Sequence, residues 1–280
     1  MNKAQNHHYV SQTHIKKFFN YDLKKIFIYD KRYGDIRYKN GTKYIFSEDN
    51  LNTMLIENEF DYATIENLYN KYFENDFNKN YKIVEKFINQ QILDKDTENA
   101  LRFFARYGVL GNHRTPEHKK EIADIFYFGL IEGLGDKILE NQEFLKVAQP
   151  YGDKKYSNSE IDLEIPNIIL DLMGDIFFTI YVPNSICDVF ILSDYCSLTL
   201  REKTNKYLNT DITEISTISF PLSSKIFLEF YSTKSTHSPQ KSEIKFLNST
   251  EVELINKETL SLSYKCVVCS DENYLQNLIS

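Results

Sequence analysis

Short apolar runs bounded by polar turns predict β-strands at both ends of the chain. Residues 25–30 and 36–39 are two such runs, and the turn-forming residues between them predict a hairpin. Later apolar runs predict four more strands, at residues 176–182, 188–192, 216–222 and 226–231. We therefore expect strands on both sides of a middle segment of different character.

That middle segment, from about residue 49 to 148, has the period of α-helices. Its clearest apolar stripe follows a spacing of three and four residues and consists of Leu101, Phe104, Ala105 and Gly108. Thr97 is the expected N-cap of this helix. A second stripe lies within residues 122–130, and a short helix is expected near residues 168–173.

A final helix is predicted near the C-terminus. Thr250 and Glu253 have the spacing of a capping box, in which each side chain bonds the backbone N–H of the other residue. An apolar face follows, made of Val252, Ile255, Thr259 and Leu262.

Together these patterns predict one α+β domain over residues 1–280. Its central helical region is flanked by strands. We therefore expect a mixed or antiparallel sheet built from the N-terminal hairpin and the C-terminal strands. Residues 150–160 form a polar break rich in turn residues, but no long linker separates the halves.

The composition is typical of a soluble globular protein, with 42% hydrophobic and 26% charged residues. The net charge of -7 argues against nucleic-acid binding over the whole surface. It leaves open a local basic patch. An aromatic content of 14% is compatible with a homo-oligomer, although no heptad repeat marks an interface.

No membrane segment is expected. The most apolar stretch, residues 165–182, is interrupted by Pro166, Asp171 and Asp175. The first residues lack the basic and apolar regions of a secretory signal, so we expect a cytoplasmic protein.

Four cysteines follow in the second half of the chain, at Cys187, Cys196, Cys266 and Cys269. The last two have the CxxC spacing of zinc ligands, but their flanks are apolar and no Gly or Pro bends the segment. We expect reduced, buried thiols rather than a zinc site.

Half of the six histidines lie near the N-terminus, at His7, His8 and His14. Ser11 is the expected N-cap of a helix over residues 12–19, which places His7 and His8 just before a helix N-terminus. Imidazoles there can bind or protonate a phosphate oxygen. The alternatives are a mobile tail, or histidines that only hydrogen-bond the sheet.

Two further positions carry candidate chemistry. Arg114 lies at a junction between helices, where its planar guanidinium can clamp a carboxylate or phosphate. His113 and His118 flank it, but a spacing of five is unfavourable for metal binding within a helix, and a solvated turn is the simpler interpretation. Asp194 ends an apolar run, a place for a catalytic or metal-binding carboxylate or for a turn former.

The order of several short motifs resembles the DUF4238 family, bacterial proteins without an assigned activity. The opening HHYVSQ is similar to the family's HHYVPQ start. Four later segments match in order: Ile28–Lys31, Arg114, Leu192–Asp194 and Phe220–Ser223. Asn256, ahead of the C-terminal segment, matches as well. The chain departs from the pattern at Ser11, which replaces a proline, and at Tyr195–Cys196, which replace an Asn-Pro pair. The resemblance implies one domain and supplies no mechanism.

The residues themselves suggest a catalytic hypothesis. If His7, His8, Arg114 and Asp194 converge, the imidazoles can act as acid and base, the guanidinium can stabilise an anionic transition state, and Asp194 can orient an imidazole or hold a divalent metal. Such a set fits a phosphodiester hydrolase, a nuclease of bacterial defence or a toxin, with nucleic acid as its partner. Glu74 is an additional candidate acid.

The alternative hypothesis is a non-catalytic module that binds a nucleotide or a protein. In that case the same His, Arg and Asp residues form a structural polar network. Burial discriminates between the two hypotheses. An open cleft around the residues favours a site, whereas complete burial with satisfied hydrogen bonds favours a scaffold.

Overall fold

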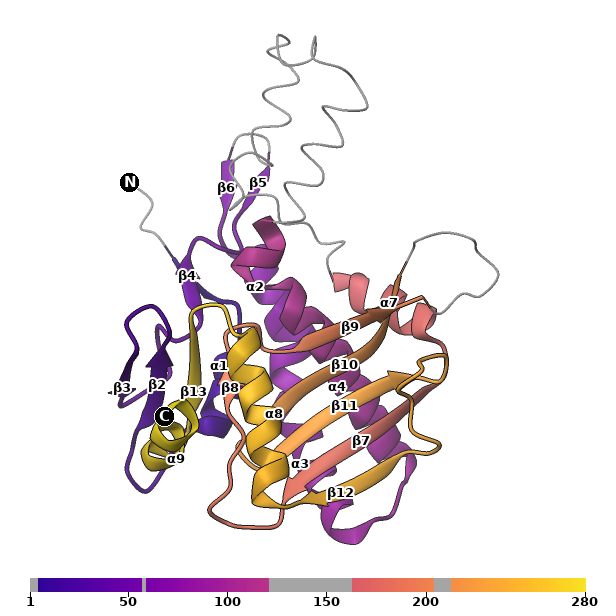
Figure 1. Cartoon of the computed structure of the whole chain (residues 1–280). Helices are drawn as coiled ribbons and strands as arrows, with labels where there is room; N and C mark the ends of the chain where they lie inside the picture. The colour runs from indigo at the N-terminus through magenta and orange to yellow at the C-terminus, as the bar shows by residue number, and fades with distance from the viewer. Residues whose placement is uncertain (1–4, 57–58, 121–162, 204–212) are drawn as a thin grey trace.

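The computed structural model describes residues 5–56, 59–120, 163–203 and 213–280, and it confirms the α+β class. Two main sheets lie side by side, with most of the helices behind the larger one (Figure 1). The predicted apolar stripe at residues 122–130 and the polar break at 150–160 lie outside the described residues.

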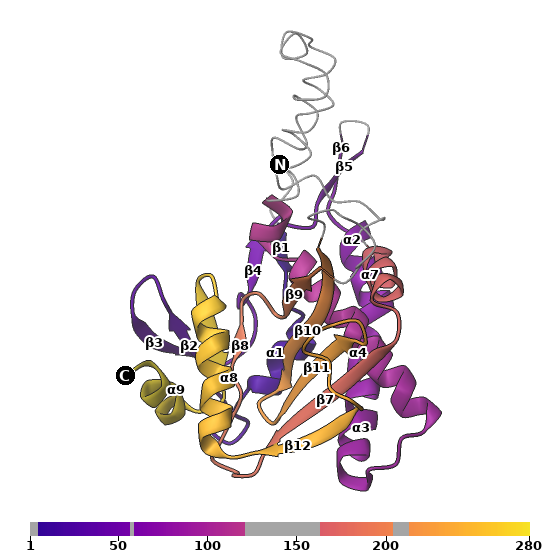
Figure 2. The same ribbon diagram turned by 45° about the vertical axis from the view of Figure 1, so that its right-hand side comes forward.

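The larger sheet has five strands in the order β12-β7-β11-β10-β9. Its strands are β7 (Ile176–Pro183), β9 (Leu198–Glu202), β10 (Glu214–Ser223), β11 (Ile226–Ser232) and β12 (Glu243–Leu247). All neighbours are antiparallel except β12, which runs parallel to β7. Three helices cover one face: α3 (Asn75–Gln90), α4 (Lys95–His113) and α7 (Ile165–Met173) (Figure 2).

The predicted N-terminal hairpin is confirmed, and it belongs to the smaller sheet of order β3-β2-β13-β8. Its strands are β2 (Ile26–Asp30), β3 (Asp35–Lys39), β8 (Leu192–Ser193) and β13 (Cys266–Cys269). The hairpin thus pairs with the C-terminal strand β13, as expected. The strands predicted at residues 176–182, 216–222 and 226–231 lie in the larger sheet instead. Two helices follow the last strands in the chain: α8 (Ser249–Leu262) and α9 (Glu272–Ile279).

The first two histidines, His7 and His8, lie in a strand. β1 (Asn6–His8) pairs with β4 (Ser47–Asp49), and His7 lies opposite Glu48. Ser11 caps α1 (Gln12–Ile15) by accepting a hydrogen bond from the Thr13 N–H at 3.2 Å, which confirms the predicted cap. A 3-10 turn (Lys16–Phe18) continues this helix. Four further elements complete the described fold: β5 (Met54–Ile56), β6 (Glu59–Asp61), α2 (Thr64–Tyr69) and a π-helix (Asn70–Glu74).

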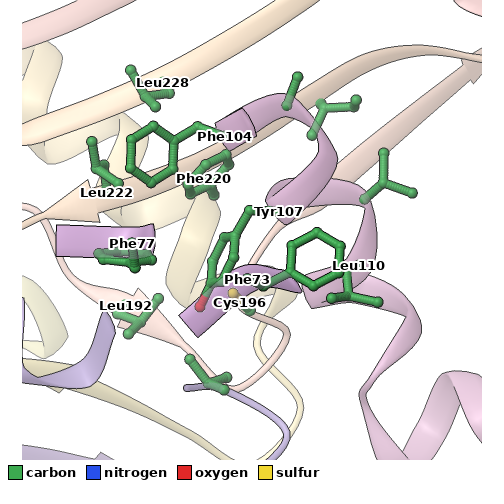
Figure 3. Close-up of a cluster of buried hydrophobic side chains, with 14 of the residues drawn as sticks. Phe73, Phe77, Phe104, Tyr107, Leu110, Leu192, Cys196, Phe220, Leu222 and Leu228 are labelled. Atoms are coloured by element: carbon green, nitrogen blue, oxygen red, sulfur yellow. The ribbon is translucent and has the colours of Figure 1, made fainter. Parts of the chain in front are cut away.

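The aromatic core fills the space between the helices and the larger sheet (Figure 3). Phe77 on α3 packs edge-to-face against Phe104 and Tyr107 on α4, with ring centroids 5.3 and 5.1 Å apart. Phe220 on β10 packs against Tyr107 from the sheet side. The stripe predicted for α4 is buried in this core, as its spacing indicated.

Three local predictions were wrong, each through an unforeseen partner. Asp94 caps α4 in place of Thr97, since its carboxylate accepts from the Thr97 N–H at 2.8 Å. The capping box of α8 is formed by Asn248 and Glu251, two residues earlier than predicted. The strand expected at residues 188–192 is reduced to Leu192–Ser193. The preceding N–H groups do not bond a neighbouring strand, because that of Phe190 donates to the Ser224 carbonyl and that of Ile191 donates to the Asn256 side chain.

The two CxxC thiols contact different parts of the core. Cys269 packs against α9 in a small cluster with Leu275, whereas Cys266 packs against the main core. Residues three apart on a strand face opposite sides, so the thiols do not point to a common position. Cys196 and Cys269 are buried and Cys266 is half-buried, but Cys187 is exposed, contrary to the expectation of buried thiols. Among the helices that the structure describes, none has the length and apolar character needed to cross a bilayer.

Gly108 is required where α4 crosses β10, and its replacement tests this packing. A Cβ atom there would lie 2.7 Å from Ile218 Cγ2 and 2.9 Å from Phe220 Cε1. We expect Gly108→Ala to lower the free energy of unfolding by about 1–3 kcal/mol, despite the higher helix propensity of Ala. Gly41→Ala is the control, because nothing lies within 4 Å of its added Cβ. Urea denaturation that shows equal stability for both variants would contradict this account.

Candidate functional site

His7 is almost fully buried, with 2% of its surface exposed. Its Nδ1 accepts a hydrogen bond from the backbone N–H of Asn52 at 2.9 Å, so the neutral ring carries its proton on Nε2. Burial lowers the pKa of His7, and Lys119 acts in the same direction against the opposing charge of Glu66. The ring is therefore neutral at physiological pH.

Arg114 joins three segments that are distant in sequence. It ends α4 and is 2% exposed. Its Nη2 donates to the His8 carbonyl at 2.6 Å, and its Nη1 donates to Glu74 Oε1 at 3.3 Å. The guanidinium also lies over the ring of Tyr69, 4.1 Å from the centroid. Burial alone would lower the pKa of Arg114, but the Glu74 carboxylate reverses this and the net shift is upward.

A second set of contacts lies beside Arg114. Asn52 Nδ2 donates to Glu66 Oε1 at 2.5 Å, and Lys119 Nζ donates to Asn52 Oδ1 at 2.7 Å. We call the whole assembly the His–Arg network, and it consists of His7, His8, Asn52, Glu66, Glu74, Arg114 and Lys119. Sequence reasoning identified four of these residues. It missed Asn52, Glu66 and Lys119, whose separate positions in the sequence carry no signal of their meeting.

Asp194 does not join this network. Its carboxylate accepts three backbone N–H groups, from Tyr264 at 2.9 Å, Lys265 at 2.5 Å and Cys266 at 3.1 Å. Burial raises the pKa of Asp194, while these three N–H groups oppose the rise. Within the described residues, no hydrogen bond or ion pair connects it to His7, His8 or Arg114. The structure thus brings together three of the four predicted residues.

His14 is held at the centre of the core. Its Nε2–H donates to the Pro221 carbonyl at 2.7 Å, so Nδ1 accepts from the Tyr107 hydroxyl at 3.3 Å and lies 3.6 Å from Cys196 Sγ. Burial lowers the pKa of His14 to about 4 and raises the pKa of Cys196 to about 12. The Cys–His pair therefore stays neutral, and its burial keeps it from any substrate.

The rings of His113 and His118 meet at the junction after α4. His113 Nδ1 lies 2.5 Å from His118 Nε2, within hydrogen-bond distance. Burial, together with His118, lowers the pKa of His113 to about 4. Both side chains are half-buried, so this junction is not the solvated turn that the spacing suggested.

Three nitrogens of the His–Arg network lack a hydrogen-bond partner among the described residues. They are the Nε2 atoms of His7 and His8 and the Nε atom of Arg114. His8 is the most accessible of the three side chains, since it is only half-buried. Burial lowers the pKa of His8 as well, and Arg114 adds to this effect while Glu66 opposes it. A neutral His8 is able to accept or donate one hydrogen bond.

No group of three or more His, Cys, Asp or Glu side chains in the described part of the chain has the arrangement of a metal site. The network instead mixes two cations with two carboxylates and two imidazoles. It is a set of matched charges around a buried guanidinium.

Comparison with protein families identifies one match. The family DUF4238, described as a protein of unknown function, matches residues 6–273, and the chain therefore belongs to this family. Comparisons with curated proteins and with solved structures give no match. The matched region includes every residue of the network and Asp194.

The role of Arg114 can be tested through stability. Arg114→Lys keeps the charge but cannot bond His8 and Glu74 while covering Tyr69, so we expect it to lower the free energy of unfolding by about 1–3 kcal/mol. Arg102→Lys is the control, because this side chain is 69% exposed and 3.7 Å from its partner Asp171. Chemical denaturation that shows the two variants equally stable would refute the structural role of Arg114.

The buried histidines predict a loss of stability in acid. A histidine in the unfolded chain takes up a proton near pH 6.5, whereas His14 does so only at about 4. Between these values the unfolded state binds more protons, so the free energy of unfolding falls as the pH is lowered.

His14→Gln removes this contribution and keeps a side-chain N–H for Pro221. The stability difference between wild type and His14→Gln should therefore narrow between about pH 7 and pH 5 in urea denaturation. His237→Gln, at an exposed position, should follow the wild type throughout. A His14→Gln difference that stays constant with pH would show that His14 is not held neutral by the fold.

Proposed function

We propose that this member of the DUF4238 family is a non-catalytic module that binds nucleic acid, and that His7, Arg114 and Asp194 are part of its scaffold. One observation carries the proposal: three of the four groups expected to perform chemistry, His7, Arg114 and Asp194, are buried and already held by contacts within the protein. Arg114 and Asp194 have 2% and 4% of their surface exposed. A catalytic group must touch its substrate.

Arg114 illustrates the point. A transition-state anion needs a guanidinium edge that faces the substrate. Here one Nη donates to the His8 carbonyl, the other donates to Glu74, and one face covers Tyr69. A substrate phosphate could reach the guanidinium only after one of these contacts was broken, which is expensive for a buried charge.

Asp194 is engaged in the same manner. Its two oxygens accept three N–H groups from the turn that leads into β13. It therefore orients a backbone turn and not an imidazole. His7 is likewise fixed, by the N–H of Asn52 at its Nδ1.

The choice of nucleic acid as ligand rests on charge. Although the chain is acidic overall, Lys and Arg are concentrated in residues 22–44, in the N-terminal hairpin and the short segments just before and after it. Concentrated positive charge on one surface is the electrostatic mark of nucleic-acid binding.

A second candidate function is favoured by His8. Its Nε2 has no hydrogen-bond partner among the described residues, and the half-buried carboxylates of Glu66 and Glu74 act on its charge. A neutral imidazole beside carboxylates is suited to general-base catalysis. This arrangement supports a phosphodiester hydrolase of bacterial defence or a toxin, with or without a divalent metal, in which Arg114 positions the His8 backbone.

Incubation of the purified protein with RNA and DNA distinguishes the two functions. Single strands and duplexes would be incubated in EDTA, in Mg²⁺ and in Mn²⁺, and resolved on denaturing gels. We expect every substrate to remain intact, because His7, Arg114 and Asp194 are buried and held by contacts within the protein. Cleavage by the wild type would overturn the proposal.

The matched variants then assign the activity. Loss of cleavage in His8→Gln, with an unchanged melting temperature and normal cleavage by His237→Gln, would establish the second candidate in its place. The melting temperature separates a lost catalytic group from a disturbed scaffold.

A further inference from the structure

We propose that the β2–β3 hairpin and the loop that follows it bind single-stranded nucleic acid. The inference rests on the proposed function and specifies the surface and the form of the ligand. We refer to residues 22–44 as the basic hairpin. Its solvent-facing side chains combine cations with aromatic rings, the two groups that recognise unpaired nucleotides.

The charge of the basic hairpin is opposite to that of the rest of the chain. Residues 22–44 contain seven Lys and Arg against three Asp, a net charge of +4. The whole chain has 33 Lys and Arg against 40 Asp and Glu, so the remainder has 26 against 37, a net charge of -11. Such segregation concentrates the attraction for a polyanion on one surface.

Two of the three acids within the hairpin are already paired. Arg32 bonds Asp30 at 2.7 Å, and Arg37 bonds Asp35 at 2.8 Å. Four lysines provide the excess of positive charge on this surface: Lys24, Lys25, Lys39 and Lys43. A phosphate backbone would therefore meet ammonium groups rather than carboxylates.

Three tyrosine rings are exposed on the same segment. Tyr33, Tyr38 and Tyr44 have 66%, 55% and 57% of their surface in solvent. Each ring has a cation above it: Arg37 lies 4.8 Å from Tyr33, Lys25 lies 3.9 Å from Tyr38, and Lys43 lies 4.7 Å from Tyr44. A base stacks on an open ring while the neighbouring cation meets its phosphate.

The position of the hairpin leaves this surface accessible. β3 is an edge strand whose only partner in the sheet is β2, and it lies at the margin of the molecule in both views (Figures 1 and 2). Lys39 Nζ donates to the Tyr44 carbonyl at 3.1 Å, which brings the loop beside β3. The loop thus adjoins the face of β3 that carries Arg37 and Lys39, while Tyr38 lies on the opposite face, and both faces meet at the free edge of the strand.

The basic hairpin also extends toward the His–Arg network. Thr42 Oγ1 donates to Gln12 Oε1 at 3.3 Å, which ties the loop to α1. Burial lowers the pKa of the His8 imidazole, and the backbone of Thr42 acts in the opposite direction and raises it. A strand bound along the hairpin would therefore end beside His8, one of the half-buried side chains of the network.

Single strands fit this surface better than duplexes. The rings offer stacking faces, and only unpaired bases can use them. In a duplex the base faces are already stacked on one another, so the tyrosines would add no stacking to its binding. An anionic membrane would likewise use the lysines without base stacking.

Fluorescence anisotropy with labelled 20-nucleotide RNA and DNA, in EDTA, tests the proposal. Two double variants carry the comparison: Lys39→Gln/Lys43→Gln on the hairpin and Lys82→Gln/Lys86→Gln on exposed positions of α3. We expect the hairpin pair to weaken binding about tenfold at low salt and to reduce the salt slope by about 1.4, since each phosphate contact on a single strand contributes about 0.7. The α3 pair should bind as the wild type does.

The aromatic contribution has its own variant. Tyr33→Leu/Tyr44→Leu keeps apolar surface but removes two stacking faces, so we expect about tenfold weaker binding of single strands and an unchanged salt slope. Duplexes of the same sequence should bind the wild type more weakly than single strands. Melting temperatures of all variants show that the fold is retained.

Several outcomes would overturn the inference. They are absence of binding, equal loss in the hairpin and α3 variants, tighter binding of duplexes than of single strands, and binding of phosphatidylserine vesicles in preference to oligonucleotides. Cleavage with added metal, together with hairpin-dependent binding in EDTA, would refute the non-catalytic function and leave the hairpin assignment standing.

Discussion

The fold depends on the engagement of one buried guanidinium. An ionised side chain cannot be withdrawn from water unless its charge and its N–H groups find partners. Arg114 meets this requirement by drawing together the His8 carbonyl, Glu74 and the ring of Tyr69. The N-terminal strand, the α2 region and the end of α4 are thereby fixed to one another. The remaining members of the network assemble around this centre.

Asp194 is a buried anion that fixes a turn of the smaller sheet. Its carboxylate holds the turn before β13, the strand against which the N-terminal hairpin pairs. A buried anion in one place and a buried cation in another thus join segments that are about 70 and more than 100 residues apart. Three of the short motifs by which the chain resembles its family, the opening HHYVSQ, Arg114 and Leu192–Asp194, contain residues of these long-range contacts.

Local rules predicted much of the secondary structure and little of the network. The hairpin, the apolar face of α4 and the cap at Ser11 follow from residues a few positions apart, and all three were predicted. The caps of α4 and α8 were misplaced because Asp94 and Asn248 accept the N–H groups of Thr97 and Glu251, so that each helix is capped two or three residues before its predicted N-cap. The contact of His7 with Asn52 has no local signature, since it depends on how β1 and the chain after β4 are packed. No local sequence pattern reports the contact of Arg114 with His8, so it could only be a hypothesis. The separation of Asp194 from both residues likewise depends on tertiary packing.

The two sets of cations in this protein differ in what the fold requires of them. Arg114 is held by hydrogen bonds on the inside, and its removal leaves unpaired groups in the core. The lysines and arginines of the basic hairpin lie in solvent, where an ion pair such as that of Arg37 and Asp35 contributes little to stability. Like charges gathered on one edge repel one another, so folding gains nothing from their concentration. The fold therefore accounts for the buried charges, and in part for Lys31 and Lys39, which bond backbone carbonyls, but it does not account for the concentration of lysines on the hairpin. The exposed cations of the hairpin, rather than the histidines at the start of the chain, are therefore the charges that a ligand would explain.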